Sequence, residues 1–480
     1  MPEGSTLEQT EAAAYAMADY LVRIPEVTDV STYVGTSSPI DFNGLVRHYY
    51  LRSGANVADI RINLIGKKHR KQQSHSITLR LRKALKEIAG RYNANIKLVE
   101  SPPGPPVIAT IVAEIYPGKA TQSYSRQTQA ALEVRHLMEE SFGVVDVDDM
   151  LVAPEKKLIF RVDRTKASLN GISIREIASA LRGVVAGADS GPLHLDNEVY
   201  PPPIKLRLPR KVRTLPTNLE QISVKGSAGN TVFLSELGTF VEETIDQPIY
   251  HKNLQPVVYV FGDTAGLPPA EAIFMLEDNV SEQQSLKDVN VVWSGEGEWY
   301  ITLRVFRDLG IAFGVAVLGI YILLLYQTQS YLLPAIQLIA LPLSVIGILP
   351  GFWLLNLLTA EKVGSWTNSV YFTATAMIGM VALAGIATRN AILLIEFIEE
   401  RKKEGKPLVQ SLIEAGALRT RPIFLTSLSA MLAAWPITLD PIFSGLAWTL
   451  IFGIAVSTLF TLVVVPIVYY MAYSKPSRQS

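Results

Sequence analysis

The sequence lacks cysteine altogether among its 480 residues. Disulfide bonds, thiolate nucleophiles and cysteine-based zinc sites are therefore excluded. The six histidines are scattered, and no two lie at the spacing of metal ligands, so we expect no metal site. No GxxxxGK[ST] loop occurs, which argues against ATP hydrolysis on this chain. Net charge is zero, because 44 basic residues balance 44 acidic ones, and nothing points to nucleic acid as a partner.

Up to about Trp299 the sequence has no long apolar run, and its pattern is that of a soluble α/β protein. Long apolar runs are abundant after that residue. About 20 apolar residues cross the hydrocarbon core of a bilayer. Five runs qualify: Leu309–Tyr326, Leu332–Leu358, Val370–Ile398, Ile423–Leu439 and Leu446–Met471. Buried helices of a soluble core are the alternative, but five runs in succession favour a membrane bundle. We predict five transmembrane helices within residues 307–473.

Positive charge in the loops gives an orientation, because Lys and Arg are enriched in cytoplasmic loops. The connection after the third run and the C-terminal tail hold most of it: Arg401, Lys402, Lys403, Lys406, Arg419 and Arg421, then Lys475 and Arg478. Both segments are predicted to be cytoplasmic, so five spans place residues 1–300 on the other side. Arg304 and Arg307, which flank the first run on that other side, disagree with the rule.

The soluble region contains a repeat. One copy begins at Met1 with a helix opened by the capping box Ser5-x-x-Glu8, followed by a strand at Val27–Val30. The other copy has a strand at Thr110–Tyr116, a Pro-Gly turn, a helix and a strand at Val144–Val147. Both read as βαβ units. Because the first copy starts at the turn, we expect its opening strand before residue 1, as in a truncated or split chain.

Other elements follow the same alternation. The patterns predict a strand at Ala58–Ile65, a helix at Ser76–Arg91, a strand at Asn95–Glu100, a Pro-rich linker at Pro102–Pro106 and a strand in "QPVVYVFGDTAG". An insert at Val152–Glu242 carries the capping box Ser173-x-x-Glu176 and the long loop "DSGPLHLDNEVYPPPIKL". That loop is either a surface hairpin or an arm that reaches another subunit.

The third apolar run contains Arg389 and Asn390. An ionisable residue in a span commonly faces the interior of a bundle and suggests a functional site. The alternative is that Arg389 reaches the headgroups, but it lies about 13 Å from the cytoplasmic end of the run. Arginine stays charged at biological pH, so its expected role is a fixed counter-charge for a carboxylate. Glu396 lies near the boundary, so we expect that carboxylate on another segment.

The fourth run adds Arg419 at its cytoplasmic mouth and Thr426 two turns further along the same face. The hydroxyls of Thr426, Ser427 and Ser429 have an alternative role, which is to return hydrogen bonds to their own helix. Both roles remain open for Thr426.

The chain resembles the resistance-nodulation-division (RND) efflux permeases of the acriflavine-resistance type. The resemblance covers essentially the whole chain and rests on "PEGSTLEQT", "VDRTKASLNGISIREIASALRG", "LQPVVYVFGD", "RNAILLIEF" and "EAGALRTRPIFLTSL". It corresponds to the C-terminal half of that family's duplicated architecture. The implied fold is an α+β periplasmic porter and docking domain, with βαβ ferredoxin-like subdomains, followed by an all-α transmembrane bundle of five helices.

The resemblance also implies domain boundaries. Residues 1–100 would form one porter subdomain without its first strand, and residues 107–150 with 244–290 a second. Residues 151–243 would be a docking subdomain, residues 307–473 the last five of twelve spans, and residues 474–480 a cytoplasmic tail. The chain would then lie in the bacterial inner membrane, with residues 1–300 in the periplasm. Its implied partners are the N-terminal half of the permease, two further copies in a homotrimer, a periplasmic adaptor, an outer-membrane channel and lipid.

The implied function is drug/proton antiport of organic amphiphilic compounds, a secondary active transport that needs the proton motive force and no cofactor. Arg389, Arg419, Thr426 and Asn390 would belong to the proton relay, whose aspartates lie in the other half. The best-known members of that family have lysine where Arg389 stands. Phe42, Tyr49 and Tyr50 would line the substrate path, or else be core aromatics. The alternatives are a heavy-metal exporter, a non-transporting assembly or binding fragment, and a protein-export component.

Overall fold

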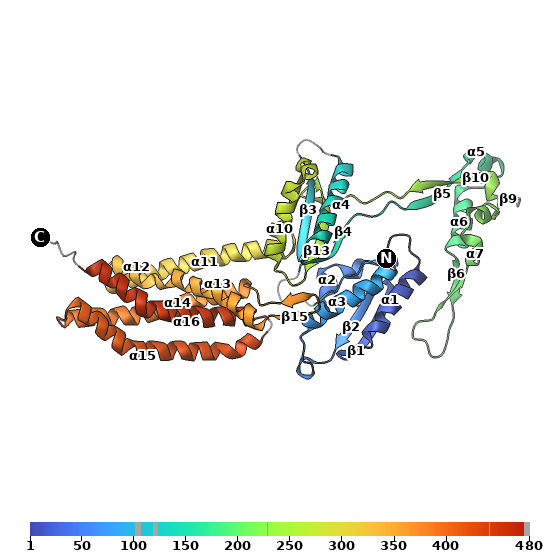
Figure 1. The fold of residues 1–480 in the computed structure, drawn as a ribbon. Helices are drawn as coiled ribbons and strands as arrows, with labels where there is room; N and C mark the ends of the chain where they lie inside the picture. Colours follow the sequence, from blue (N-terminus) through green and yellow to red (C-terminus); the bar gives the residue numbers. More distant parts are fainter. Residues whose placement is uncertain (101–106, 119–122, 228, 441, 475–480) are drawn as a thin grey trace. The chain divides into compact units, whose positions relative to one another are not determined.

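The computed structural model describes residues 1–100, 107–118, 123–227, 229–440 and 442–474 (Figure 1). The chain divides into two units, one made of Met1–Leu151 with Ile249–Ser480 and the other of Val152–Pro248. The predicted linker Pro102–Pro106 and the tail cations Lys475 and Arg478 lie outside the described residues.

Residues 1–100 form the first subdomain. Its elements are α1 (Leu7–Leu21), β1 (Val27–Thr36), α2 (Phe42–Val46), β2 (Ser53–Leu64) and α3 (Ser74–Arg91). Strands β1 and β2 pair antiparallel, and apolar side chains of α1 and α3, among them Met17, Leu21, Ile77 and Leu85, build the core with Val30 and Ile60. The capping box lies one residue later than predicted, because Thr6 and Gln9 exchange the two hydrogen bonds.

The strand predicted at Asn95–Glu100 is wrong. Among the described residues this segment has no ladder partner, and the sheet of the first subdomain contains only β1 and β2. A strand needs a neighbour for its backbone N–H and C=O groups. Ile96 and Leu98 still pack against the core of the subdomain, and the backbone N–H of Leu98 donates to a side chain, Asp146 Oδ2, at 3.0 Å.

The second subdomain contains β3 (Ile111–Pro117), α4 (Tyr124–Glu140), β4 (Val144–Asp149), β13 (Val258–Thr264), α10 (Pro269–Glu282) and β14 (Val289–Val292). Its four strands lie in the order β14-β3-β13-β4. Strand β13 is antiparallel to both β3 and β4, so β3 and β4 are parallel to each other, as the βαβ pattern predicts. Residues 111–115 of β3 are all buried because the strand is central. A short hairpin of β11 (His251–Lys252) and β12 (Gln255–Pro256) precedes β13.

The unit Val152–Pro248 has its own core around Ile177, Leu234 and Leu237. It contains β5 (Lys156–Val162), α5 (Arg164–Leu169), α6 (Ile174–Val185), β6 (Ala188–Pro192), β7 (Pro203–Leu206), α7 (Arg210–Arg213), α8 (Pro216–Glu220), β8 (Ser223–Lys225), β9 (Thr231–Phe233), α9 (Leu234–Leu237) and β10 (Gly238–Thr244). The predicted capping box of Ser173 and Glu176 is confirmed. The segment predicted as a long loop, residues 189–206, forms most of the antiparallel hairpin of β6 and β7, as the surface-hairpin alternative predicts. Val199 and Tyr200 between the two strands are each 86% exposed.

The described residues contain five apolar helices long enough to cross a membrane, which confirm the predicted spans. They are α11 (Gly297–Thr328), α12 with α13 (Leu332–Leu338 and Ala340–Thr359), α14 (Ala374–Lys403), α15 (Leu408–Ala434) and α16 (Ser444–Tyr473). The predicted ends are wrong for the fourth span, because its helix begins at Leu408, not Ile423. Arg419 therefore lies inside a helix. Hydropathy marks the hydrocarbon-spanning stretch, whereas a helix continues through its charged ends.

The helices approach one another closely where glycine leaves room. A Cβ atom on Gly347 or Gly351 of α13 would overlap Val456 or Phe452 of α16. A Cβ atom on Gly453 of α16 would overlap Leu383 of α14. Helix α16 therefore lies against both α13 and α14.

A small hairpin connects the second span to the third. It consists of β15 (Glu361–Val363) and β16 (Trp366–Asn368). Val363, which is 4% exposed, packs with Leu79 of α3 and with Val145 and Ala265 of the second subdomain. Asn368 Nδ2 donates to Ser76 Oγ of α3 at 3.1 Å. The segment that leads into α14 thus contacts both subdomains.

Candidate functional site

Asn390 is the buried member of the polar pair in α14, with an exposed fraction of 1%. Its Nδ2 donates to Ser427 Oγ of α15 at 3.2 Å, and Thr458 Oγ1 of α16 donates to the same oxygen at 2.8 Å. Asn390 Oδ1 is buried and accepts no hydrogen bond from the described residues. These side chains form a polar bridge between three membrane helices, and one acceptor in it remains unsatisfied.

Asn390, and not Arg389, faces the interior of the five helices. Arg389 is exposed, as are Ile378, Ala382, Gly385 and Glu396 on the same helical face. A Cβ atom added at Gly385 would have no neighbour within 4 Å. In the described portion of the chain, Arg389 has neither an ion pair nor a hydrogen bond. Around Arg389 this face of α14 carries the small residues Ala382 and Gly385 and is left open by the described residues.

Glu396 does not serve as the counter-charge of Arg389. Its Oε1 accepts a hydrogen bond from Gln327 Nε2 of α11 at 2.5 Å, near the end of that helix. The carboxylate is exposed.

Arg419 and Thr426 lie on α15, and no described hydrogen bond joins either of them to Arg389. The Arg419 guanidinium carbon lies 4.9 Å from the centre of the Phe397 ring of α14, and its Nε is buried without an acceptor among the described residues. Thr426 is exposed, and its Oγ1 donates to the carbonyl of Ile423 at 3.0 Å. Thr426 therefore returns its hydrogen bond to its own helix, the alternative that the sequence had left open.

The three aromatic candidates near residue 45 do not form a core. Phe42 is 57% exposed and Tyr50 is 37% exposed, so their interpretation as core residues is wrong. Tyr49 lines a cavity of about 50 Å³, and the guanidinium of Arg52 lies 4.3 Å from the centre of its ring. Of the three, Tyr49 is the one that the structure places at a cavity.

The cavity lies between the first and the second subdomain and is rich in charge. Its lining includes Arg47, Arg52, Lys97, Asp146, Met150, Phe261 and Asp263. Arg47 Nη1 pairs with Asp263 Oδ2 at 3.2 Å, and Thr110 Oγ1 donates to Asp263 Oδ1 at 2.8 Å. Burial raises the pKa of the Asp146 carboxyl, although the charge of Arg82 opposes the shift. Burial likewise lowers the pKa of the Lys97 ammonium, against the charge of Asp148.

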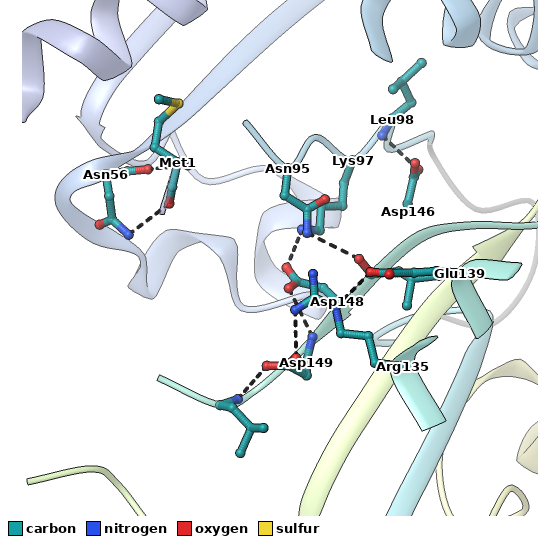
Figure 2. Close-up of polar contacts among 12 residues, drawn as sticks. Met1, Asn56, Asn95, Lys97, Leu98, Arg135, Glu139, Asp146, Asp148 and Asp149 are labelled. Atoms are coloured by element: carbon teal, nitrogen blue, oxygen red, sulfur yellow. Dashed lines mark hydrogen bonds and ion pairs between the residues drawn. The ribbon is translucent and has the colours of Figure 1, made fainter. Parts of the chain in front are cut away.

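Acidic residues of β4 bind the first subdomain along this boundary (Figure 2). Lys97 pairs with Asp148, and the backbone N–H of Leu98 donates to Asp146. Asn95 Nδ2 donates to the backbone carbonyl of Val147 at 3.2 Å. The unpaired segment 95–100 is thus held against the edge strand of the neighbouring sheet by side-chain contacts.

Sequence reasoning missed several of these residues. Nothing in the sequence links Thr458 to Ser427, because the two lie on different helices. The alternation of Asp146 and Asp148 with buried valines in "VVDVDD" is a detectable signal, since it predicts two carboxylates on one face of β4. It does not reveal which cations they meet.

The sequence matches the AcrB/AcrD/AcrF family over residues 1–473. The cobalt-zinc-cadmium resistance protein CzcA of Cupriavidus metallidurans is 26% identical, over 66% of this chain and 29% of its own length. The multidrug resistance protein MdtF of Escherichia coli K12 is 27% identical, over 48% of this chain and 20% of its own. The chain spans about a third, or less, of the length of the curated relatives that it matches.

The crystal structure of a heavy metal efflux pump has the same fold. It superposes with a TM-score of 0.76 at 18% identity and covers 98% of this chain and 46% of that chain. The family match covers nearly every residue, and the five apolar helices agree with a multi-pass protein of the inner membrane. The chain therefore belongs to the AcrB/AcrD/AcrF family, the resistance-nodulation-division efflux permeases.

Proposed function

We propose that this chain supplies the C-terminal half of a permease that uses the proton motive force to export organic amphiphilic compounds. It would act as a secondary active transporter without a cofactor. The observation that carries the proposal is the placement of Arg389, a permanent cation within a membrane span. It lies on a face of α14 that the described chain leaves open.

Arg389 would act as a fixed counter-charge. A guanidinium does not release its proton, so an acid must carry the proton through the membrane. A carboxylate from the N-terminal half of the permease would lie against the open face of α14 and pair with Arg389. Protonation of that carboxylate would remove its charge and break the pair. Helix α14 would then be free to shift.

A shift of α14 would reach the soluble region through the β15–β16 hairpin. The hairpin directly precedes α14 and packs through Val363 and Trp366 against both subdomains. The two subdomains would respond by moving apart and together, which would open and close the cavity that Tyr49 lines. The shift of α14 would be supported by Asn390, Arg419 and Thr426. Asn390 would act through its hydrogen bond to Ser427 of α15.

The domain assignment belongs to the same proposal. The two subdomains would be periplasmic porter subdomains, and residues 151–243 a docking subdomain. The strand order β14-β3-β13-β4 of the second subdomain supports a ferredoxin-like assignment. A strand from outside this chain would complete the first subdomain in the same way. The working assembly would be a trimer with a periplasmic adaptor and an outer-membrane channel.

Heavy-metal export is the second candidate, and the similarity to CzcA favours it. Against it, the chain has no cysteine and few methionines, nine in all, whereas soft metals prefer thiolate and thioether ligands. Cells that express the whole permease distinguish the two candidates. Tolerance of amphiphilic dyes supports drug export, whereas tolerance of cobalt, zinc or cadmium ions with unchanged dye accumulation supports metal export.

The test uses the whole permease, reconstituted from this chain and a complementary N-terminal half. Arg389→Met should abolish proton-driven efflux and leave assembly intact, and Arg389→Lys should retain efflux because it keeps the positive charge. Arg421→Met serves as a control, since Arg421 is an exposed cation of α15 without a described ion pair. Efflux retained by Arg389→Met contradicts the proposal. Lack of efflux by the unaltered, assembled permease supports a non-transporting assembly fragment instead.

A further inference from the structure

A basic loop between β2 and α3 has no role in the proposed transport. It spans residues 66–71, "GKKHRK", and includes a 3₁₀ turn at Lys67–His69. From Ile60 to Lys86 the sequence contains nine Lys or Arg residues and no Asp or Glu. In a chain with zero net charge, this is a strong local excess of positive charge.

The cations of this loop form no ion pair with any residue that the structure describes. Lys67, Lys68 and Lys71 are exposed, and among the described residues none of them forms an ion pair. Nε and Nη1 of Arg70 are shielded from solvent and have no hydrogen-bond acceptor in the described portion of the chain. Shielded guanidinium nitrogens without an acceptor are costly. The loop therefore offers donors that nothing in the described structure satisfies.

The nearby carboxylate of Glu26 does not satisfy Arg70, because it is already occupied. Its Oε2 accepts from Arg80 Nη2 at 2.8 Å. That hydrogen bond is the main reason why the pKa of Glu26 lies below its ordinary value, and the charge of Arg70 contributes only a smaller amount. Arg70 thus lies within electrostatic range of an acid that is bound to another arginine.

One hydrogen bond and one longer-range charge interaction place the basic loop at the end of the membrane bundle. The pKa of Asp440, between the fourth and the fifth span, is lowered chiefly by backbone donation from Phe443 and Ile442, and also by the charge of Lys67. Five positions after the loop, Ser76 of α3 accepts a hydrogen bond from Asn368, which lies in the connection between the second and the third span. Both connections leave the membrane on the side of the soluble subdomains.

We propose that residues 66–71 bind the anionic headgroups of phospholipids on the membrane face from which the soluble subdomains project. Clustered Lys and Arg residues next to a bilayer are attracted to anionic lipids, and a guanidinium matches phosphate oxygens in geometry. A phosphate would supply the acceptor that Arg70 lacks. The inference requires only that the five helices lie in a membrane, so it stands apart from the proposed transport.

The absence of cysteine allows a site-specific test on the full chain. Gln73, an exposed residue two positions after the loop, is replaced by cysteine (Gln73→Cys), and the cysteine is labelled with a fluorophore. The protein is placed in nanodiscs of phosphatidylcholine with or without phosphatidylglycerol, and each disc contains a lipid with a nitroxide on its headgroup. Phosphatidylglycerol should increase quenching of the label, and raised salt should reverse the increase.

The charge variant Lys67→Gln/Lys68→Gln/Lys71→Gln should lose this increase. Its affinity for short-chain phosphatidylglycerol, titrated in detergent, should fall about 100-fold, or about five-fold per cation. Lys205→Gln/Lys211→Gln/Lys225→Gln is the matched control, because these lysines are exposed and lie in the other unit. It should behave like the unaltered chain. Equal quenching in both kinds of nanodisc, or an equal loss in the control, overturns the proposal.

Inorganic phosphate distinguishes a lipid site from a site for free anions. Inorganic phosphate, added at the concentration used for short-chain phosphatidylglycerol, should leave the quenching by the headgroup nitroxide unchanged. The bilayer presents many headgroups at once, so free phosphate competes poorly with it. If phosphate displaces the loop as effectively as short-chain phosphatidylglycerol does, the lipid proposal is wrong.

Discussion

The carboxylate of Asp146 in β4 accepts a hydrogen bond from the guanidinium of Arg82 in α3, 64 positions earlier in the chain. Their side chains are 7% and 9% exposed, respectively. Asp146 also has a φ of +55°, in the left-handed region that Asn and Asp tolerate better than most residues. The pair joins the two subdomains through a buried contact, at the boundary where the proposed mechanism requires movement.

Asp146→Asn should destabilise the chain by about 3 kcal/mol, because it leaves the buried Arg82 without its counter-charge. Asparagine tolerates the backbone conformation of this position, so the loss reports the ion pair. The double variant Arg82→Met/Asp146→Asn should recover much of that stability, since neither charge then remains buried and asparagine keeps the left-handed backbone of position 146. Chemical denaturation of the detergent-solubilised chain measures both effects. Equal stability of Asp146→Asn and the unaltered chain would show that the pair contributes nothing.

Gly385→Leu tests whether a partner covers the open face of α14. Because a Cβ atom there has no neighbour within 4 Å, the chain alone should keep its stability within about 0.5 kcal/mol. The same substitution should block association with the N-terminal half, which we measure by co-purification. Gly347→Leu is the matched control and should destabilise the chain itself, because α16 fills that position. Normal co-purification of the Gly385 variant would mean that the face is lipid-exposed.

The spans could be predicted because hydrophobic length is a local property of the sequence. Contacts between them could not. The helical period places Arg389 and Asn390 on adjacent faces but does not say which face the bundle covers; packing around α14 decides that Asn390 is buried. The Ser427 oxygen accepts hydrogen bonds from Asn390 and Thr458, whereas the sequence suggested only a donor role toward its own helix for this hydroxyl. Hydrogen bonds between hydroxyl groups on separate helices produce no periodic pattern in the sequence, so they could not be predicted from it.

Val363→Ala tests the contact between the β15–β16 hairpin and the two subdomains. The removal of two buried methyl groups should cost about 2 kcal/mol, and proton-driven efflux by the whole permease should fall further than this stability loss explains. Lys362→Ala is the control, because Lys362 lies beside Val363 but is exposed. Dye efflux and thermal unfolding are measured on the same samples. Efflux that falls only in proportion to folded protein would argue against a role in coupling.

The Glu26–Arg80 pair predicts a pH dependence of stability. The pKa of Glu26 is lowered, first by the hydrogen bond from Arg80, so its carboxylate favours the folded state at neutral pH. That contribution is complete above the ordinary glutamate pKa and is lost as pH falls through the lowered value. Melting temperatures recorded from neutral to acidic pH should therefore drop less steeply for Glu26→Gln. If the melting temperatures of the unaltered chain and of Glu26→Gln fall in parallel with pH, the Glu26–Arg80 pair does not contribute to the pH dependence of stability.

The strand expected at Asn95–Glu100 marks another limit of sequence reasoning. Its apolar alternation is real, and Ile96 and Leu98 do pack on the core. A strand also depends on a neighbouring strand, and no local pattern reveals whether one is present. The acids of β4 could be placed on one face from their spacing. That they meet Lys97 and Arg82 depends on how the subdomains pack.

The structure of this chain bound to the N-terminal half of its permease tests the central claim most directly. The account predicts a carboxylate oxygen of that half within about 4 Å of a guanidinium nitrogen of Arg389, with the open face of α14 covered. An Arg389 side chain directed to the headgroups, with no carboxylate near it, would contradict the account.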